Sequence, residues 1–380
     1  MSVIQLTQNL IAIPSYLGER TDERAIGEFV FRYLKQFSFL KVEKQKVSSG
    51  RFNIVARTNG RPRLFLAGHL DTVEPRQSWL KNQFGGLIED SRLFGLGALD
   101  MKSGVAAILD SLKDFEQVSG LTLLFYCDEE YDFLGMRKFV DAYEGKEIGD
   151  LAVLAEPTDL KIWDAHRGII EISFAVEGKT GHAADLRSGR NAIVGVMGVL
   201  NDLQTWLGDF KDPVLGTPSM NIAYLRGGLN LGKKSESETL VGKQGNNIAD
   251  FAEAVIDIRP TRTGLCAEKV IAQIRKLLEE RKLLLRKCSI RHDFGSLYTD
   301  PREAEVLEKV VERVIGKVGY LDPVTRGYGD GQLLQEEFGV PVVYLGPKGE
   351  NAHGADEWVD VHSLKKLREI YSILIKEYCR

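Results

Sequence analysis

The stretch that most constrains the fold of this chain is an apolar run, Leu64–Ala67, followed directly by Gly-His-Leu-Asp-Thr at 68–72. Four apolar residues in succession predict a strand that is buried on both faces, as in a parallel sheet. His69 and Asp71 are two positions apart, so their side chains point the same way from an extended backbone. This arrangement suits a metal-ligating imidazole with a carboxylate that orients it or binds beside it, although both are also ordinary loop residues.

Two later apolar strands end in the same way. Residues 121–126 lead into Cys-Asp-Glu-Glu at 127–130, and residues 151–154 lead into Ala-Glu at 155–156. In open α/β sheets ligands bind at the carboxyl ends of the strands, so we expect these acidic residues near the His-x-Asp pair. Taken alone, the acidic run at 127–130 is equally compatible with a solvated turn.

A glycine-rich stretch, 95–104, precedes a predicted helix that begins at Val105. Its spacing matches neither the dinucleotide-binding fingerprint nor a P-loop. A different role explains the glycines better: they allow neighbouring backbone segments to approach this stretch closely and hold Asp100 just before the helix. His353 follows a predicted strand at 341–345 and reaches the same edge if the sheet is continuous. A cluster of His, Asp and Glu without sulfur ligands predicts one or two divalent metal ions.

The pattern of the chain changes at Gly168, where half-buried alternation replaces the continuous apolar runs. From there the predicted elements follow in the β-α-β-β-α-β order of ferredoxin-like domains. We therefore predict an α/β catalytic domain in two segments, 1–167 and 293–380, with a mostly parallel central sheet flanked by helices. A ferredoxin-like α+β domain, 168–292, is inserted between the two segments. The polar segment 229–245 is expected to be an excursion from that domain.

The predicted helices cover residues 3–12, 22–37, 190–207, 266–281, 302–317 and 362–378. The predicted strands cover residues 40–46, 53–58, 64–67, 121–126, 151–154, 169–176, 219–227, 248–258, 284–292 and 341–345.

Composition narrows the function classes. The chain has 380 residues, a formal charge of −4 and no basic block, so nothing indicates a nucleic-acid or membrane partner. No window approaches the ~18 consecutive apolar residues of a membrane span. The four cysteines are widely spaced without a Cys-x-x-Cys pair, which predicts reduced thiols in a cytoplasmic protein.

The order of these motifs resembles the co-catalytic zinc amidohydrolases that include aminoacylase, acetylornithine deacetylase, succinyl-diaminopimelate desuccinylase and glutamate carboxypeptidase. Each motif is short and common alone, but seven in the family's order are specific and cover nearly the whole chain. They are Gly-His-Leu-Asp-Thr-Val at 68–73, Gly-Ala-Leu-Asp-Met-Lys-Ser-Gly at 97–104, Asp-Glu-Glu at 128–130, Glu-Pro-Thr at 156–158, Gly-His-Ala-Ala at 181–184, Asp-Ile-Arg-Pro at 257–260 and Asn-Ala-His at 351–353.

The resemblance implies a zinc-exopeptidase-like sheet that holds two metal ions. One ion would be held by His69, Asp100 and Glu156. The other would be held by Asp100, Glu130 and His353, with Asp100 bridging the two. Zinc is expected, with cobalt or manganese as alternatives, because oxygen and imidazole ligands accept all three. Two cations would lower the pKa of a bridging water and polarise the scissile carbonyl.

The resemblance also implies roles for residues that do not bind metal. Asp71 would fix the ring of His69, and Glu129 would act as the general base. His182 would stabilise the oxyanion of the tetrahedral intermediate in the partner subunit's site. The inserted domain would serve as a lid and would form a homodimer. The residues that would bind a substrate carboxylate or carbonyl are Arg259, Arg167 and Asn247.

The predicted function is hydrolysis of the amide bond of an N-acyl amino acid, as in the deacetylase and desuccinylase branches. A glutamate at position 156 favours these branches and glutamate carboxypeptidase over the aminopeptidases. A carboxypeptidase or dipeptidase that uses the same two metal ions is the alternative. A catalytically silent binding protein of the same fold is less compatible with the sequence, because every expected ligand and the base are present.

Overall fold

The computed structural model describes residues 1–235, 238–325 and 327–379. The chain forms two compact units. Unit 1 comprises Met1–Ala165, Tyr298–Asp322 and Gly329–Arg380, and unit 2 comprises His166–Leu297 and Pro323–Tyr328. The boundaries fall in two short strands, β8 (Ala165–His166) and β14 (Leu297–Tyr298). Unit 2 is therefore slightly wider than the inserted domain predicted at 168–292, and it takes up a short segment that the sequence had placed in the catalytic domain.

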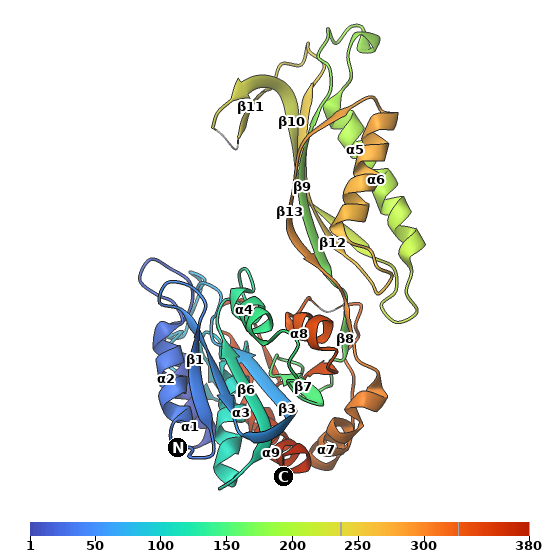
Figure 1. Ribbon diagram of the computed structural model, residues 1–380. Coiled ribbons are helices and arrows are strands. Elements are labelled where there is room, and N and C mark those ends of the chain that lie inside the picture. The colour runs from blue at the N-terminus through green and yellow to red at the C-terminus, as the bar shows by residue number, and fades with distance from the viewer. Residues whose placement is uncertain (236–237, 326, 380) are drawn as a thin grey trace. The chain divides into compact units, whose positions relative to one another are not determined.

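Unit 1 contains a six-stranded sheet in the order β1-β2-β6-β3-β7-β15 (Figure 1). The strands are β1 (Lys41–Lys46), β2 (Phe52–Arg57), β3 (Asn59–His69), β6 (Ser119–Tyr126), β7 (Leu151–Leu154) and β15 (Val342–Tyr344). The four strands from β6 to β15 run parallel, whereas β1 and β2 pair antiparallel at one edge. The prediction of an α/β fold with a mostly parallel central sheet is confirmed.

Helices cover both faces of this sheet, which explains why its parallel strands are apolar throughout. One face packs against α1 (Val3–Ile11), α2 (Arg24–Leu34), α3 (Lys102–Ser111), α7 (Glu305–Ile315) and α9 (Val361–Tyr378). Alternate side chains of β3 divide between the faces: Leu64 and Leu66 join this core, whereas Phe65 contacts Phe139 on the opposite face. That opposite face carries α4 (Leu134–Tyr143) and α8 (Gly331–Phe338).

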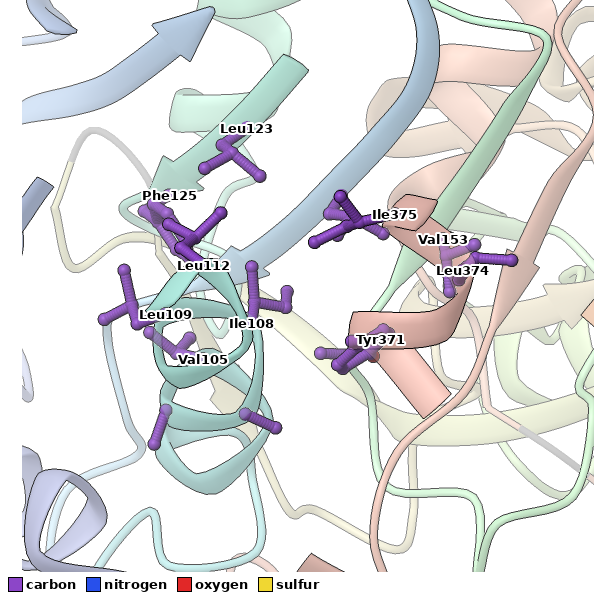
Figure 2. Packing of buried hydrophobic residues seen from close by; sticks show 14 of the residues in the cluster. Val105, Ile108, Leu109, Leu112, Leu123, Phe125, Val153, Tyr371, Leu374 and Ile375 are labelled. Atoms are coloured by element: carbon purple, nitrogen blue, oxygen red, sulfur yellow. The ribbon is translucent and has the colours of Figure 1, made fainter. Parts of the chain in front are cut away.

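The centre of the larger core is α3, whose ten residues are all buried. Figure 2 shows Val105, Ile108 and Leu109 of this helix in the same cluster as Tyr371 and neighbouring residues of α9. Burial of one such side chain stabilises the fold by about 1.5–3 kcal/mol. Since α3 begins two residues after Asp100, this packing also fixes the position of that carboxylate.

The sequence analysis missed several short elements of unit 1. Among them is α4, which begins after Phe133 in a left-handed conformation (φ 58°) without a side-chain cap, so no N-terminal signal marks it. A second, four-stranded sheet was also missed because its strands have only two or three residues each. Its strands, in spatial order, are β16 (Gly349–Glu350), β17 (Trp358–Asp360), β5 (Arg92–Phe94) and β4 (Ile88–Glu89).

Unit 2 is a five-stranded antiparallel sheet with two helices that share one hydrophobic core. Its elements are β9 (Ile169–Glu177), α5 (Ala192–Trp206), β10 (Ser219–Lys233), β11 (Thr239–Gly242), β12 (Phe251–Arg259), α6 (Ala267–Glu280) and β13 (Leu284–Phe294). Without β11, this is the predicted β-α-β-β-α-β order. The prediction of an excursion at 229–245 is wrong in part, because β10 continues to Lys233 and pairs with β11. Residues 236–237 of that segment lie outside the described residues.

Four short 3₁₀ helices complete the described elements, namely η1 (Leu112–Asp114), η2 (Leu186–Ser188), η3 (Leu207–Phe210) and η4 (Pro301–Ala304). Within the described part of the chain, no helix combines the length and the apolar character that crossing a membrane requires.

Candidate metal centre

The candidate ligands of unit 1 meet at one edge of its sheet, where the parallel strands end. His69 is the last residue of β3, Glu130 follows β6, and Glu156 follows β7. Asp100 stands just before α3, and His353 lies in the loop between β16 and β17. The topology thus brings together residues that are up to 284 positions apart, at the edge where α/β sheets bind ligands.

The side-chain atoms of these residues form two groups that share Asp100. In the first group, His69 Nε2 lies 3.1 Å from Asp100 Oδ1 and 3.7 Å from Glu156 Oε1. In the second group, His353 Nε2 lies 3.3 Å from Asp100 Oδ2 and 3.1 Å from Glu130 Oε2. Within each group the potential ligand atoms all lie within 4.8 Å of one another. These are the two ligand sets that the resemblance implied.

The donor set fits divalent cations. Its atoms are imidazole nitrogens and carboxylate oxygens, which suit zinc and similar ions. Glu130 Oε1 is buried and has no hydrogen-bond partner among the described residues. A buried carboxylate oxygen of this kind costs free energy unless a proton or a cation satisfies it, so Glu130 Oε1 fits the role of a ligand to a cation. Glu129 also lies within ligand distance of His69 and Glu130.

The electrostatics of the cluster show an excess of buried negative charge. Burial, reinforced by the charges of Asp100 and neighbouring carboxylates, raises the pKa of Glu156 well above its ordinary value. Burial also raises the pKa of Glu129, and the nearby charge of Glu156 adds to this effect. Hydrogen bonds to Asp100 and Glu130 raise the pKa of His353 to about 10. Divalent cations would neutralise this charge and replace the protons.

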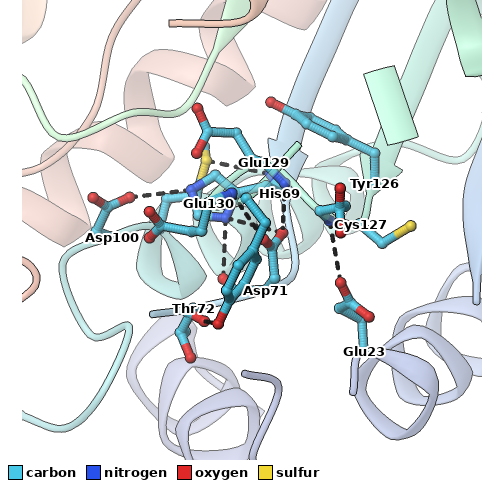
Figure 3. Close-up of polar contacts among 12 residues, drawn as sticks. Glu23, His69, Asp71, Thr72, Asp100, Tyr126, Cys127, Glu129 and Glu130 are labelled. Atoms are coloured by element: carbon cyan, nitrogen blue, oxygen red, sulfur yellow. Dashed lines mark hydrogen bonds and ion pairs between the residues drawn. The ribbon is translucent and has the colours of Figure 1, made fainter. Parts of the chain in front are cut away.

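Asp71 contacts both the ring of His69 and the backbone of the acidic residues that follow β6 (Figure 3). The ring of His69 approaches the backbone carbonyl of Asp71, with Nδ1 3.1 Å from that oxygen, whereas the Asp71 carboxylate lies 3.6 Å from Nδ1. The carboxylate instead accepts hydrogen bonds from the backbone N–H groups of Glu129 (3.2 Å) and Glu130 (2.9 Å). The segment that begins at Asp128 and carries Glu129 and Glu130 is called the acidic turn below. Asp71 therefore positions the acidic turn at least as much as it orients the imidazole of His69.

Glu357 is a supporting residue that the sequence analysis missed. It is buried, and its carboxylate accepts hydrogen bonds from the backbone N–H groups of Gly97 (2.8 Å), Leu99 (2.7 Å) and Asp100 (2.9 Å). Burial raises its pKa to about 8. Because these bonds join residues about 260 positions apart, no local spacing could reveal them; the only signal is an acidic residue shortly after His353.

Asp330 was also missed, because the glycine-rich sequence around it resembles a loop. It is buried at the start of α8, and its Oδ1 accepts a hydrogen bond from the hydroxyl of Tyr126 at 2.8 Å. Burial raises the pKa of Asp330 to about 7. This contact joins α8 to the end of β6, from which the acidic turn departs.

Two glycines allow the close packing that positions Glu156. A Cβ atom on Gly104 would lie 2.4 Å from the carbonyl oxygen of Ala155, and a Cβ atom on Gly346 would lie 2.0 Å from that of Glu156. Both distances are far below van der Waals contact, so only glycine permits this approach of α3 and the loop after β15.

The other predicted site residues belong to unit 2 and are not part of this cluster. His182 and Asn247 lie together in an isolated bridge, and both follow or precede strands at the same end of the unit 2 sheet. Arg259 lies at the opposite end, where its guanidinium binds Asp257 with both Nε (2.7 Å) and Nη2 (2.9 Å). Arg167, at that same end, donates to the carbonyl of Leu215 and to the hydroxyl of Ser219.

The parallel sheet and the paired ligand groups at its edge are the features of a dinuclear metallohydrolase. The chain belongs to peptidase family M20/M25/M40, whose model matches residues 65–377, and it is a hydrolase of that family. The resemblance identified from the sequence is thereby confirmed.

Individual relatives extend the likeness over the whole chain. Acetylornithine deacetylase of Buchnera aphidicola subsp. Schizaphis graminum is 29% identical over 397 residues, which cover 100% of this chain and 98% of that protein. An M20 family metallo-carboxypeptidase from Sulfolobus solfataricus shares the fold with a TM-score of 0.77, at 15% identity over 99% of both chains. A dinuclear metal-binding M20 peptidase from Bacillus subtilis gives a TM-score of 0.69, at 16% identity over 98% of both chains.

Proposed function

We propose that this protein hydrolyses the amide bond of an N-acyl amino acid and releases a free amino acid. The observation that carries the proposal is the pair of ligand groups sharing Asp100, with Glu129 beside them. The full-length similarity to acetylornithine deacetylases supports an acyl amino acid as the substrate class. A carboxypeptidase or dipeptidase is the second candidate, because an M20 carboxypeptidase and a yeast dipeptidase share the fold.

His69, Asp100 and Glu156 would hold one metal ion, and Asp100, Glu130 and His353 the other. Zinc is the proposed metal, since four-coordinate sites of imidazole and carboxylate suit it. When bound, two such ions supply Lewis-acid polarisation of the substrate carbonyl and a nucleophilic water. Asp71 and Glu357 hold the backbone segments that carry Glu130 and Asp100, so the ligands are in place before the substrate arrives.

Glu129 is the proposed general base. Its carboxylate lies within ligand distance of His69 and Glu130. A carboxylate beside the reacting centre can accept a proton from water and, once protonated, donate it to a leaving group. Glu129 would therefore take a proton from the attacking water and deliver it to the leaving nitrogen.

The geometry of unit 2 supports a homodimer as the working form. His182 and Asn247 flank one end of the unit 2 sheet, and Arg259 ends β12 at the other. The nine residues of β12 are eight steps of about 3.3 Å and so span about 26 Å, too far for one small substrate to touch both ends. We therefore propose that His182 serves as oxyanion donor in the partner's active site, while Arg259 and Arg167 bind the substrate carboxylate.

Exposed apolar side chains supply a surface for this dimer. On α5, the side chains of Val194 and Met197 are 65% and 56% exposed, and on β10 Ile222 and Leu225 are exposed as well. Exposed apolar side chains of this kind are available for burial in an interface between subunits. The four cysteines are free, which is consistent with the cytoplasmic location proposed from the sequence.

Substrate specificity can be tested with a panel after metal removal by a chelator. The panel contains N-acetylornithine, N-succinyl-diaminopimelate, several other N-acyl amino acids and a few dipeptides, each assayed without metal and with zinc, cobalt or manganese. We expect zinc to restore cleavage of an acyl amino acid. Cleavage of dipeptides alone would favour the second candidate, and no cleavage with two metal ions bound would refute both.

The shared active site can be tested by mixing two inactive variants, Glu129→Gln and His182→Ala. In a mixed dimer, one site combines an intact Glu129 from one subunit with an intact His182 from the other. We expect activity to return on mixing and subunit exchange, up to about a quarter of the wild-type value if one site in two recovers in half of the dimers. Absence of recovery in verified mixed dimers would refute a role for His182 across the interface.

A further inference from the structure

The acidic turn that carries Glu129 and Glu130 begins with an unusual backbone conformation. Asp128 has a φ of +71°, in the left-handed region that side-chain-bearing residues seldom adopt. Such a conformation persists only where surrounding contacts hold it. The turn must therefore be fixed by its neighbours rather than by its own preference.

Side-chain carboxylates accept hydrogen bonds from most of the backbone N–H groups between residues 128 and 134. Asp71 accepts from residues 129 and 130, as described above, and Asp128 Oδ2 accepts from the N–H groups of Asp132 and Leu134, both at 3.2 Å. The N–H group of Asp128 itself donates to Glu23 Oε1 at 3.1 Å. Glu23 comes from the start of α2, more than 100 positions earlier in the chain.

A single guanidinium joins these carboxylates. Arg51 Nη2 lies 2.5 Å from Glu23 Oε1 and 2.5 Å from Asp128 Oδ1, and its Nε donates to Glu23 Oε2 at 2.8 Å. The Glu23 and Asp128 side chains are 2% exposed and that of Arg51 is 13% exposed, so little water competes with the pairing. Loss of one member would leave the other charges buried without compensation.

We propose that Glu23 and Arg51 form a clamp that holds the acidic turn in place. The clamp would thereby position Glu130, a ligand of one of the two proposed metal sites, and Glu129, the proposed base. The Glu23–Arg51 clamp contacts the turn that bears Glu129 and Glu130. Within the described part of the chain, neither Glu23 nor Arg51 forms a hydrogen bond or an ion pair with His69, Asp100 or Glu156. Those three residues are held by β3, by Glu357 and by the glycines around residue 156. Loss of the clamp would therefore weaken the metal site that includes Glu130 and leave the site that includes Glu156 intact. Glu23 and Arg51 are positioning residues, and this inference rests on the proposed two-metal function.

The test compares zinc binding by wild type and by Arg51→Met, Arg51→Lys and Glu23→Gln variants. Metal-free protein is titrated with zinc against a chromogenic chelator, which resolves the two binding steps, and Glu156→Gln identifies the step that belongs to the other site. We expect Arg51→Met to weaken only the step that involves Glu130, by tenfold or more, and to lower kcat about 10- to 100-fold. Lysine retains the positive charge but cannot bind the carboxylates of Glu23 and Asp128 at the same time in the planar geometry of a guanidinium. The zinc affinity and kcat of Arg51→Lys should therefore lie between those of Arg51→Met and wild type.

The matched control is Arg57→Met, which removes an arginine of the adjacent strand whose partner, Glu43, is partly exposed. It should leave both zinc affinities and kcat unchanged. Circular dichroism and thermal melting verify that each variant is folded at the assay temperature.

Two outcomes would overturn the clamp: unchanged zinc affinities in Arg51→Met and Glu23→Gln, or an equal loss at both metal sites in folded protein. A different result would contradict the proposed function instead. If wild-type protein bound two zinc ions but cleaved no substrate of the panel, the hydrolase assignment would fail, while the comparison of zinc affinities would still decide whether the clamp exists.

Discussion

The two units of this protein present their functional residues in opposite ways. In unit 1, His69, Glu130 and Glu156 lie at or just after the ends of strands that are buried on both faces, and carboxylates such as Asp71 and Glu357 fix the backbone that carries Glu130 and Asp100. In unit 2, His182 is an exposed loop residue, and Arg259 ends a strand with one buried and one open face. If the proposed function holds, unit 1 would contain a preorganised chemical centre, whereas unit 2 would supply recognition groups that a substrate or a partner completes.

The strongest test of this contrast is Glu129→Gln in unit 1. The substitution keeps the size of the side chain but removes the base, so we expect kcat to fall about 10²–10⁴-fold. Zinc binding by the remaining ligands and the melting temperature should change little. The control is Glu144→Gln at the exposed end of α4, which should behave as wild type. Hydrolysis at the wild-type rate by Glu129→Gln would remove Glu129 from its proposed role.

In unit 2, His182→Ala is expected to have the next largest effect. Loss of a donor to the oxyanion should lower kcat about 10²-fold, with little change in KM. Because His182 is exposed, its removal should leave the free energy of unfolding unchanged within ~0.5 kcal/mol. His362→Ala, which removes another exposed histidine, serves as the control. Equal activities of the two variants would place His182 outside the reaction.

Arg259→Lys should produce a smaller and more selective effect. Lysine cannot bind a carboxylate through a planar fork, so KM for substrates with a free α-carboxylate should rise about tenfold. The matching α-carboxamide substrates should be cleaved equally slowly by wild type and variant. Arg187→Lys, at a highly exposed arginine of the same unit, is the control. A similar rise in KM for the α-carboxylate and the α-carboxamide substrates would show that Arg259 does not bind the substrate carboxylate.

The smallest predicted effect concerns the stability of unit 2. Burial alone would raise the pKa of Asp212, but hydrogen bonds from Arg262 and from the backbone N–H groups of Leu215 and Val214 lower it below its ordinary value of 3.8. A carboxyl whose folded pKa is lowered contributes stability above its unfolded pKa and loses it as the pH falls through the folded value.

Arg262→Gln should therefore lower the free energy of unfolding by about 1 kcal/mol at neutral pH, as expected for one partly exposed ion pair. The difference from wild type should shrink below pH 3.8, where protonation removes the Asp212 charge in both proteins. Denaturant unfolding at pH 7 and at pH 3 measures both values, and a difference that does not depend on pH would contradict the assigned pairing.

The two units also differ in how much of them the sequence predicted. The buried strand β7 and the half-buried strand β9 were both predicted, because continuous burial and strict alternation leave clear patterns. The sequence prediction ended β10 too early, because the end of the strand contains glycine and polar residues and is exposed from Asn230 to Lys233, so no hydrophobic alternation marks it.

The same distinction applies to the functional residues. His69, Asp100, Glu130, Glu156 and His353 were predicted because each lies in a short motif beside a recognisable strand or helix, and the structure brings all five together. Glu357 and Arg51 could not be predicted, since their importance depends on hydrogen bonds to segments that are far away in the sequence. Local spacing can reveal candidate ligands, whereas the residues that position them can be identified only from the tertiary structure.

The most direct test of the central claim is a zinc titration of chelator-treated protein, with bound metal and hydrolysis of N-acetylornithine or the best panel substrate measured on the same samples. We predict that the metal-free protein is inactive and that activity rises to its maximum as bound zinc approaches two ions per chain. Glu129→Gln should bind the same two ions and remain inactive. Full activity in the metal-free protein, or maximal activity that is independent of bound zinc, would contradict a two-metal centre built on Asp100.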